Sequence, residues 1–225
     1  MKPAAVFRAV SKVYGRFAAL RNLSISFPVG SCSVILGANG AGKSTLLRMA
    51  AGLASPTRGE VRVFGALPQQ QRGRVAYMSH APMLYDELSA MENLKYFAAL
   101  SAGKGCDCVG SPEMALRAVE LDPKLKRPVG EYSQGMRQRA SFARVLQADP
   151  ELLLLDEPFS NMDVGSVQQM VELLADFRTW PVAAGDGRTI LLTTHQAQLA
   201  MPLADTVVTL KDGALVLNEM VEASL

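Results

Sequence analysis

The sequence lacks the features that mark secreted, membrane-spanning or disulfide-stabilised proteins. It has three cysteines in 225 residues, and this small odd number argues against a disulfide framework. No apolar run approaches the roughly eighteen residues that a bilayer-spanning helix needs. Arg8 interrupts the N-terminal stretch where a signal peptide would be apolar, so no export signal is expected. We therefore expect a reduced, cytoplasmic protein that does not insert into a membrane and meets one only through a partner.

A strong excess of charge of either sign is also missing. Lysine and arginine number 23 against 21 aspartates and glutamates, which gives a net charge of +2. Binding to nucleic acid driven by charge is therefore not expected. The hydrophobic content of 49% is ordinary for a folded domain, and the length suffices for one large domain or two small ones. These totals leave the local motifs to indicate the function.

The most informative stretch is Gly37–Thr45, which reads GANGAGKST and fits the P-loop pattern G-x-x-x-x-G-K-[ST]. In such a loop successive backbone N–H groups turn inward around a polyphosphate. Lys43 is expected to reach the β- and γ-phosphates, and the Ser44 hydroxyl is expected to bind Mg²⁺. The apolar run at 33–36 and the helical run from Thr45 supply the required strand and helix. We predict a nucleotide site lined by Gly37, Ala38, Asn39, Gly40, Ala41, Gly42, Lys43, Ser44 and Thr45.

Two further strands end in polar residues. Asp156 and Glu157 follow the four leucines at 152–155, and His195 follows the strand predicted at 189–194. At the carboxyl ends of such strands one carboxylate can hold Mg²⁺ and the next can orient or deprotonate a water. The alternative for the acidic pair is a solvated turn. For His195 a structural role and a contact to the γ-phosphate both stay open.

The order of predicted elements indicates an α/β fold with a parallel sheet covered on both faces. Residues 5 to 30 read as antiparallel strands, and 207–217 read as a terminal hairpin. A helical block at 84–148 is predicted to interrupt the α/β part as an inserted subdomain. Within it, Ser89 and Glu92 form a capping box and Ser111 is an N-cap.

Two more positions have both a structural and a functional interpretation. Ser133 and Gly135 begin a helix that runs to about Leu146, and its N-terminus is a second anion site unless it is only a capped helix end. Since a P-loop protein binds one triphosphate at its loop, this second site must close on the same nucleotide or on that of another subunit. Tyr14 lies in the turn after the first strand, where it is either a half-buried strand-end aromatic or a platform that stacks on adenine.

With these motifs in this order, the chain resembles the nucleotide-binding subunit of ABC transporters over essentially its full length, 1–225 as one domain. Gly37–Thr45 matches the Walker A motif, and Leu152–Glu157 matches Walker B with the catalytic glutamate. Tyr132–Met136 is a variant, YSQGM, of the LSGGQ signature, and Ser160–Asp163 matches the D-loop. His195 matches the switch histidine, and Tyr14 falls at the adenine-stacking position.

The resemblance implies a P-loop NTPase core of the RecA type with an antiparallel β subdomain and an inserted helical subdomain. It further implies an ATPase that uses Mg²⁺ and forms a homodimer with ATP sandwiched between the subunits. Ser133 and Gly135 of one subunit would contact the γ-phosphate held by the other, with Asp163 at the shared nucleotide site. Separate transmembrane permease subunits would bind near the His80 loop and the helical block. The protein would lie at the cytoplasmic face of the inner membrane.

One position departs from the family pattern. The Q-loop usually places Gln where this chain has His80, which we predict to take part in the Mg²⁺ and water shell, since a neutral imidazole can accept from a metal-bound water. Three short segments resemble the ATPase subunit of the haem exporter for cytochrome c maturation: Tyr77–His80, Asp163-Val164 and Thr193–Gln196. Export of haem is therefore one hypothesis for the cargo.

Other functions remain as alternatives. The chain could serve another ABC efflux system for drugs, lipids or polysaccharides. A soluble ABC ATPase that acts on ribosomes or DNA is disfavoured by the near-neutral charge and the single cassette. A regulatory subunit with little turnover is motivated by His80 and the altered signature. Cys106 and Cys108 could bind a metal, but no second pair completes four ligands, and Lys124–Arg127 is expected to be a solvated connector.

Overall fold

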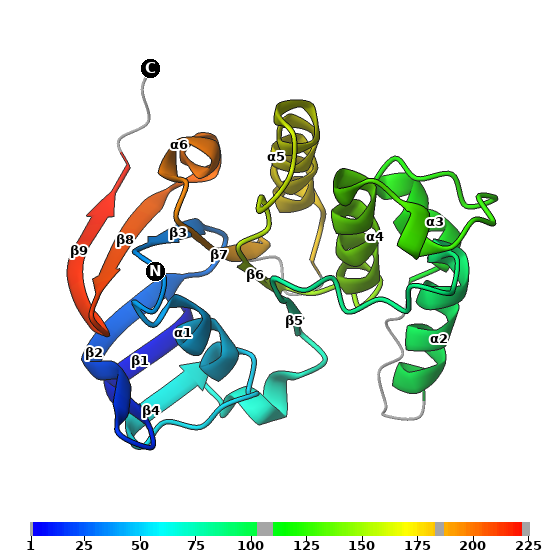
Figure 1. Cartoon of the computed structure of the whole chain (residues 1–225). Coiled ribbons are helices and arrows are strands. Elements are labelled where there is room, and N and C mark those ends of the chain that lie inside the picture. The colour runs from blue at the N-terminus through cyan, green and yellow to red at the C-terminus, as the bar shows by residue number, and fades with distance from the viewer. Residues whose placement is uncertain (1, 103–109, 183–186, 222–225) are drawn as a thin grey trace.

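The computed structural model describes residues 2–102, 110–182 and 187–221. Two sheets form its framework (Figure 1). A three-stranded antiparallel sheet has the order β2-β1-β4, with β1 (Pro3–Tyr14), β2 (Phe17–Pro28) and β4 (Arg58–Val63). A six-stranded sheet has the order β5-β6-β7-β3-β8-β9, with β5 (Val75–Met78), β6 (Leu152–Asp156), β7 (Thr189–Thr194), β3 (Cys32–Leu36), β8 (Thr206–Lys211) and β9 (Ala214–Met220). Only β9 runs antiparallel to its neighbour in the larger sheet, so the predicted α/β class and terminal hairpin are confirmed.

The central strands β3, β6 and β7 of the larger sheet are buried on both faces, which explains their apolar runs. Leu153 and Leu155 belong to a core shared with α5 (Val164–Thr179) and α6 (Ala197–Ala200). The other two leucines of β6 face a second core shared with α1 (Lys43–Ala50) and the three-stranded sheet. Side chains of β6 thus alternate between two cores, and the acidic residues of the site stand where this strand ends.

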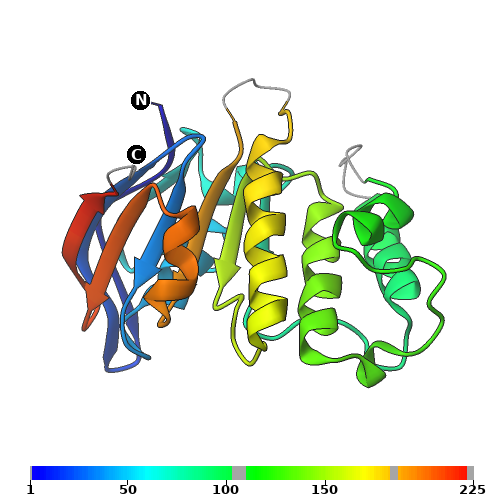
Figure 2. The ribbon, with the colours of Figure 1, turned by 90° about the horizontal axis from the view of Figure 1, so that it is seen from above.

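Three helices pack together beyond the β5 end of the six-stranded sheet (Figure 2). They are α2 (Ala90–Ala102), α3 (Pro112–Ala118) and α4 (Gln134–Leu146). No helix in the described ranges is both long enough and apolar enough to cross a bilayer. The predicted capping box is confirmed, since Glu92 N donates to Ser89 Oγ at 3.3 Å and Ser89 N donates to Glu92 Oε2 at 2.9 Å.

Two details in this region could not be predicted from the sequence. The helical block was predicted to begin at 84; α2 itself begins at Ala90, directly after the capping residue Ser89, and 84–89 form a loop. The buried Asn93 side chain holds the preceding segment as a loop, because it accepts from Tyr85 N at 2.8 Å and donates to Tyr85 O at 3.0 Å. Ser111 stands at the N-cap of α3, yet its hydroxyl donates to Glu113 Oε2 at 2.7 Å and makes no capping bond to the helix. A local acceptor therefore competes with the cap.

Candidate nucleotide-binding site

A pocket of about 390 Å³ lies where β3, β6 and β7 end. It brings together the P-loop, the acidic pair and both histidines, as the ends of parallel strands are expected to do. Twelve of its lining residues were predicted from the sequence: Ala38, Asn39, Gly40, Ala41, Gly42, Lys43, Ser44, Thr45, His80, Asp156, Glu157 and His195. Phe17, Ala19 and Ser160 complete the lining.

The loop conformation depends on glycine at the start of α1. Gly42 has φ +102°, a region in which L residues are strained, and a Cβ there would collide with the carbonyl oxygen of Ala19. The chain therefore passes close to β2 before it enters the helix at Lys43. This close approach places the first N–H groups of α1 at the pocket, where they can bind an anion.

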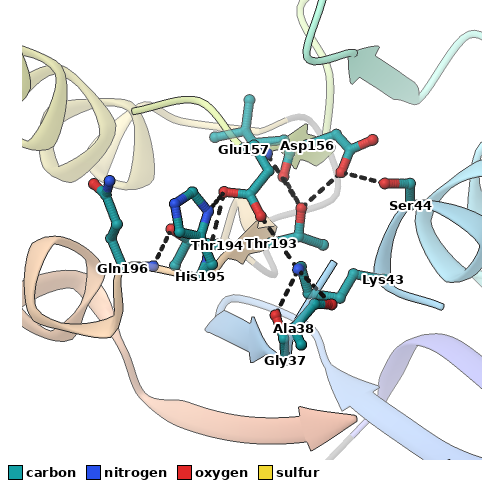
Figure 3. Close-up of polar contacts among 11 residues, drawn as sticks. Gly37, Ala38, Lys43, Ser44, Asp156, Glu157, Thr193, Thr194, His195 and Gln196 are labelled. Carbon is teal, nitrogen blue, oxygen red and sulfur yellow. Dashed lines mark hydrogen bonds and ion pairs between the residues drawn. The ribbon is translucent and has the colours of Figure 1, made fainter. Parts of the chain in front are cut away.

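Lys43 lies at the centre of the pocket's polar contacts (Figure 3). Its side chain is buried, and Nζ donates to Gly37 O at 2.7 Å and to Ala38 O at 3.4 Å. Nζ also lies 3.2 Å from Glu157 Oε1. The ammonium is thus held between the loop that would carry the phosphates and the glutamate predicted to act on water.

Asp156 is a buried carboxylate that accepts from three hydroxyls. Oδ1 accepts from Ser44 Oγ at 2.9 Å and from Thr193 Oγ1 at 2.8 Å, and Oδ2 accepts from Tyr77 OH at 3.0 Å. Burial, followed by the negative charge of Asp156, raises the pKa of Tyr77 to about 12, so the phenol is protonated and donates at neutral pH. The Ser44 hydroxyl and this carboxylate are hard oxygen ligands that fit Mg²⁺, which proteins commonly bind through one or two carboxylates and substrate phosphates.

Glu157 is held in place from β7. It has φ +53°, and its N–H donates to Thr193 O at 3.1 Å and to Thr193 Oγ1 at 3.2 Å. Its Oε2 lies 2.9 Å from His195 Nδ1 and accepts from His195 N at 3.3 Å (Figure 3). A left-handed turn at a non-glycine residue persists only when its neighbours fix it, as these contacts do. The carboxylate is therefore oriented before any substrate binds.

The structure separates two aromatic candidates for contact with a base. Tyr14, at the end of β1, is 47% exposed and does not line the pocket, and Lys12 Nζ lies 4.9 Å from its ring centre. Phe17, at the start of β2, does line the pocket and is 58% exposed. Sequence reasoning missed Phe17, although a second aromatic residue in the same hairpin was a usable signal.

Phe17→Ala is expected to weaken ATP binding more than Tyr14→Ala does. A base stacked on an aromatic ring contributes about 1–3 kcal/mol, and only the Phe17 ring lines the pocket. Titration of each variant with a fluorescent adenine nucleotide measures the difference. A larger loss in Tyr14→Ala would instead support the original prediction that Tyr14 stacks on adenine.

Ser133, Gly135 and Asp163 lie outside the pocket lining. Ser133 is exposed and caps α4 by accepting from Met136 N at 3.3 Å. Asp163 caps α5 by accepting from Ser166 N at 2.9 Å and from Ser166 Oγ at 2.7 Å, and these bonds lower the pKa of Asp163. A Cβ at Gly135 would collide with Ser166 Oγ, so the two helix starts are in direct contact. The three residues share one region of the molecule, separate from the P-loop.

The remaining predicted ligands cannot be placed in the same way. Cys106 and Cys108 lie outside the described residues. His80 is exposed and reaches the pocket lining from the segment that follows β5. Its predicted part in a Mg²⁺ shell stays a prediction.

A buried acidic strand end facing a strand–loop–helix phosphate loop defines a P-loop nucleotide-binding protein. The profile of the ABC transporter family matches residues 20–160, and the chain belongs to this family. The predicted fold class is thereby confirmed.

Relatives of known name are similar over most of this chain. The fluoroquinolones export ATP-binding protein of Mycobacterium tuberculosis is 36% identical over 202 residues, which cover 88% of this chain and 64% of that protein. The Fe(3+) ions import ATP-binding protein FbpC of Brucella melitensis is 32% identical over 221 residues, which cover 96% and 61%. The chain thus spans less than two thirds of the length of these relatives.

Solved structures have the same fold. The dimeric ATP-binding cassette MJ0796 bound to ADP and Pi superposes with a TM-score of 0.82 at 24% identity, covering 97% of this chain and 99% of that one. A structure described as the ATP-binding subunit of an ABC transporter gives a TM-score of 0.75 at 26% identity, covering 97% and 90%.

Proposed function

We propose that the chain is the ATP-binding subunit of a transporter and hydrolyses ATP to drive transport through separate membrane subunits. The observation that carries the proposal is the arrangement of Lys43, Asp156 and Glu157 around one pocket, with His195 bound to Glu157. Positioning and electrostatic stabilisation supply most of the catalysis in phosphoryl transfer, and this pocket offers both.

In the proposed reaction each residue keeps the role that its contacts suggest. The P-loop N–H groups and Lys43 bind the phosphates, and the triphosphate draws Lys43 away from Glu157. Glu157, held through Oε2 by His195, then orients the attacking water and accepts its proton. Mg²⁺, held through Ser44 and Asp156, would supply positive charge that offsets the charge of the phosphates. His80, at the same pocket, would accept a hydrogen bond from a water bound to Mg²⁺.

We further propose that two copies of the chain close around ATP. Ser133 and Asp163 are exposed, and together with Gly135 they lie outside the pocket of their own subunit. The capped start of α4 offers free N–H groups to an anion, and a phosphate of a second copy would use them. The dimeric state named for the MJ0796 structure supports this arrangement by analogy.

The permease subunits are proposed to bind next to the His80 segment. Four large side chains are exposed there or on the adjoining α2: Met83, Tyr85, Tyr96 and Leu100. The Tyr85 and Tyr96 rings pack edge to face at 5.1 Å between centres. An exposed apolar patch of this kind is typical of a protein interface, and it would place the chain at the cytoplasmic face of the membrane as a peripheral subunit.

The cargo is the least constrained part of the proposal. Haem export is motivated by His80 and the Thr193–Gln196 sequence, whereas the relatives named above are a fluoroquinolone exporter and an Fe(3+) importer. Neither name supports haem, so efflux of another compound is the competing proposal.

Affinity purification of the tagged chain from solubilised membranes tests both partner and cargo. We expect a membrane permease to co-purify, and we expect haem to stimulate the ATPase of the reconstituted complex more than a fluoroquinolone does. Stimulation by the drug alone would overturn the haem hypothesis. Recovery of ribosomes or DNA in place of a permease would overturn the transport function itself.

A further inference from the structure

Tyr77 makes a contact that the proposed reaction does not use. It lies on β5, three residues before His80, and its hydroxyl donates to Asp156 Oδ2 at 3.0 Å. The other carboxylate oxygen, Oδ1, accepts from Ser44 and Thr193. The two oxygens of Asp156 therefore have different partners, and Tyr77 alone links this carboxylate to β5 among the hydrogen bonds described.

The rotation of an aspartate carboxylate needs such an external constraint. The terminal torsion of aspartate, χ2, has a broad distribution. The backbone position of Asp156 therefore does not by itself decide which carboxylate oxygen faces a ligand. The Tyr77 side chain is a rigid, half-buried ring. Its strand, β5, pairs with β6, and Tyr77 lies opposite Leu154 in that pairing. Interaction with Tyr77 also raises the pKa of Arg48, a residue of α1.

We propose that Tyr77 is a positioning residue that fixes the Asp156 carboxylate so that Oδ1 faces Ser44, and thereby links the His80 segment to the Mg²⁺ site. The link follows from chain geometry, because a shift at the end of β5 moves both the Tyr77 hydroxyl and the His80 segment that lines the pocket. Partners that orient a metal ligand commonly affect metal affinity without touching the metal. The inference rests on the proposed function in one respect, namely that the pocket binds ATP with Mg²⁺.

The test is the Mg²⁺ dependence of nucleotide binding in Tyr77→Phe, which keeps the ring and removes only the hydroxyl. A fluorescent ATP analogue is titrated in EDTA and over a range of Mg²⁺ concentrations, so that the readout is binding and not turnover. We expect affinity in EDTA to stay unchanged, and the Mg²⁺ concentration for half-maximal enhancement to rise about tenfold. Thr179→Val, which removes a hydroxyl from an exposed residue at the end of α5, is the control and should behave as the unsubstituted protein.

Two results would overturn the inference. One is an unchanged Mg²⁺ dependence in Tyr77→Phe. The other is an equal loss of affinity with and without Mg²⁺, which would indicate a general packing role for the hydroxyl. Failure of the unsubstituted protein to bind nucleotide under either condition would instead overturn the proposed function together with this inference.

Discussion

Glu157→Gln is expected to lower ATP turnover by about 10²–10⁴-fold and to leave ATP binding intact. The amide is nearly isosteric, so it keeps a hydrogen bond to His195 but can no longer accept the proton of the attacking water. It also loses the negative charge 3.2 Å from Lys43, which frees the ammonium for the phosphates. Steady-state phosphate release and nucleotide titration measure the two effects separately.

Glu172→Gln is the matched control for this variant. Glu172 is an exposed carboxylate on α5 whose described contact is a hydrogen bond from Gln168, so its substitution should leave turnover unchanged. Light scattering in the presence of ATP should show that Glu157→Gln accumulates as a dimer. Loss of turnover with persistent dimer formation would exclude a regulatory subunit of low activity. Unchanged turnover in Glu157→Gln would remove Glu157 from the mechanism.

Lys43→Ala is expected to weaken ATP binding by about 2–5 kcal/mol, the usual effect of truncating one member of a buried charge pair at an interface. Lys43 is buried in the P-loop, and Gly37 O and Ala38 O already direct its Nζ to the place where phosphates would bind. Its removal also leaves Glu157 without its cation, so the carboxylate then repels the phosphates. Calorimetric titration with ATP gives the change directly.

Lys211→Ala serves as the control, since Lys211 is an exposed lysine at the end of β8. Lys43→Ala is also expected to unfold at a lower temperature than Lys211→Ala, because it leaves the largely buried carboxylate of Glu157 without its cation. If Lys43→Ala bound ATP as tightly as the control, the phosphates would have to bind somewhere other than this loop.

Elements set by local pattern could be predicted from the sequence. The four leucines of β6 indicated a strand buried on both faces, and this strand does end at Asp156 in the larger sheet. The P-loop could be predicted equally well, because its residue types follow from the local backbone geometry at Gly42 and from the charge of Lys43. The capping box at Ser89 also marked the start of α2, whereas the loop over the six residues before it could not be predicted, because that loop depends on a side chain from the helix itself, Asn93.

The contacts that assemble the site were harder to predict, because they join distant parts of the chain. Tyr77 and Asp156 are 79 residues apart, and their hydrogen bond exists only because β5 pairs with β6 in one particular register. The choice between Tyr14 and Phe17 was also hard to predict. Tyr14 and Phe17 are paired with each other at the end of the β1–β2 hairpin and only Phe17 lines the pocket, a difference that apolar alternation does not reveal.

The contact between Gly135 and Ser166 means that two separate constraints limit the size of the residue at position 135. One is the proposed approach to a phosphate of a second copy, and the other is the space that Ser166 occupies inside the same subunit. Because Ser166 also holds Asp163, a side chain added at 135 would disturb the start of α5 before it met any nucleotide. A loss of function in a Gly135 variant would therefore combine this internal steric effect with the proposed intersubunit effect. Only a paired change to glycine at Ser166 separates the two.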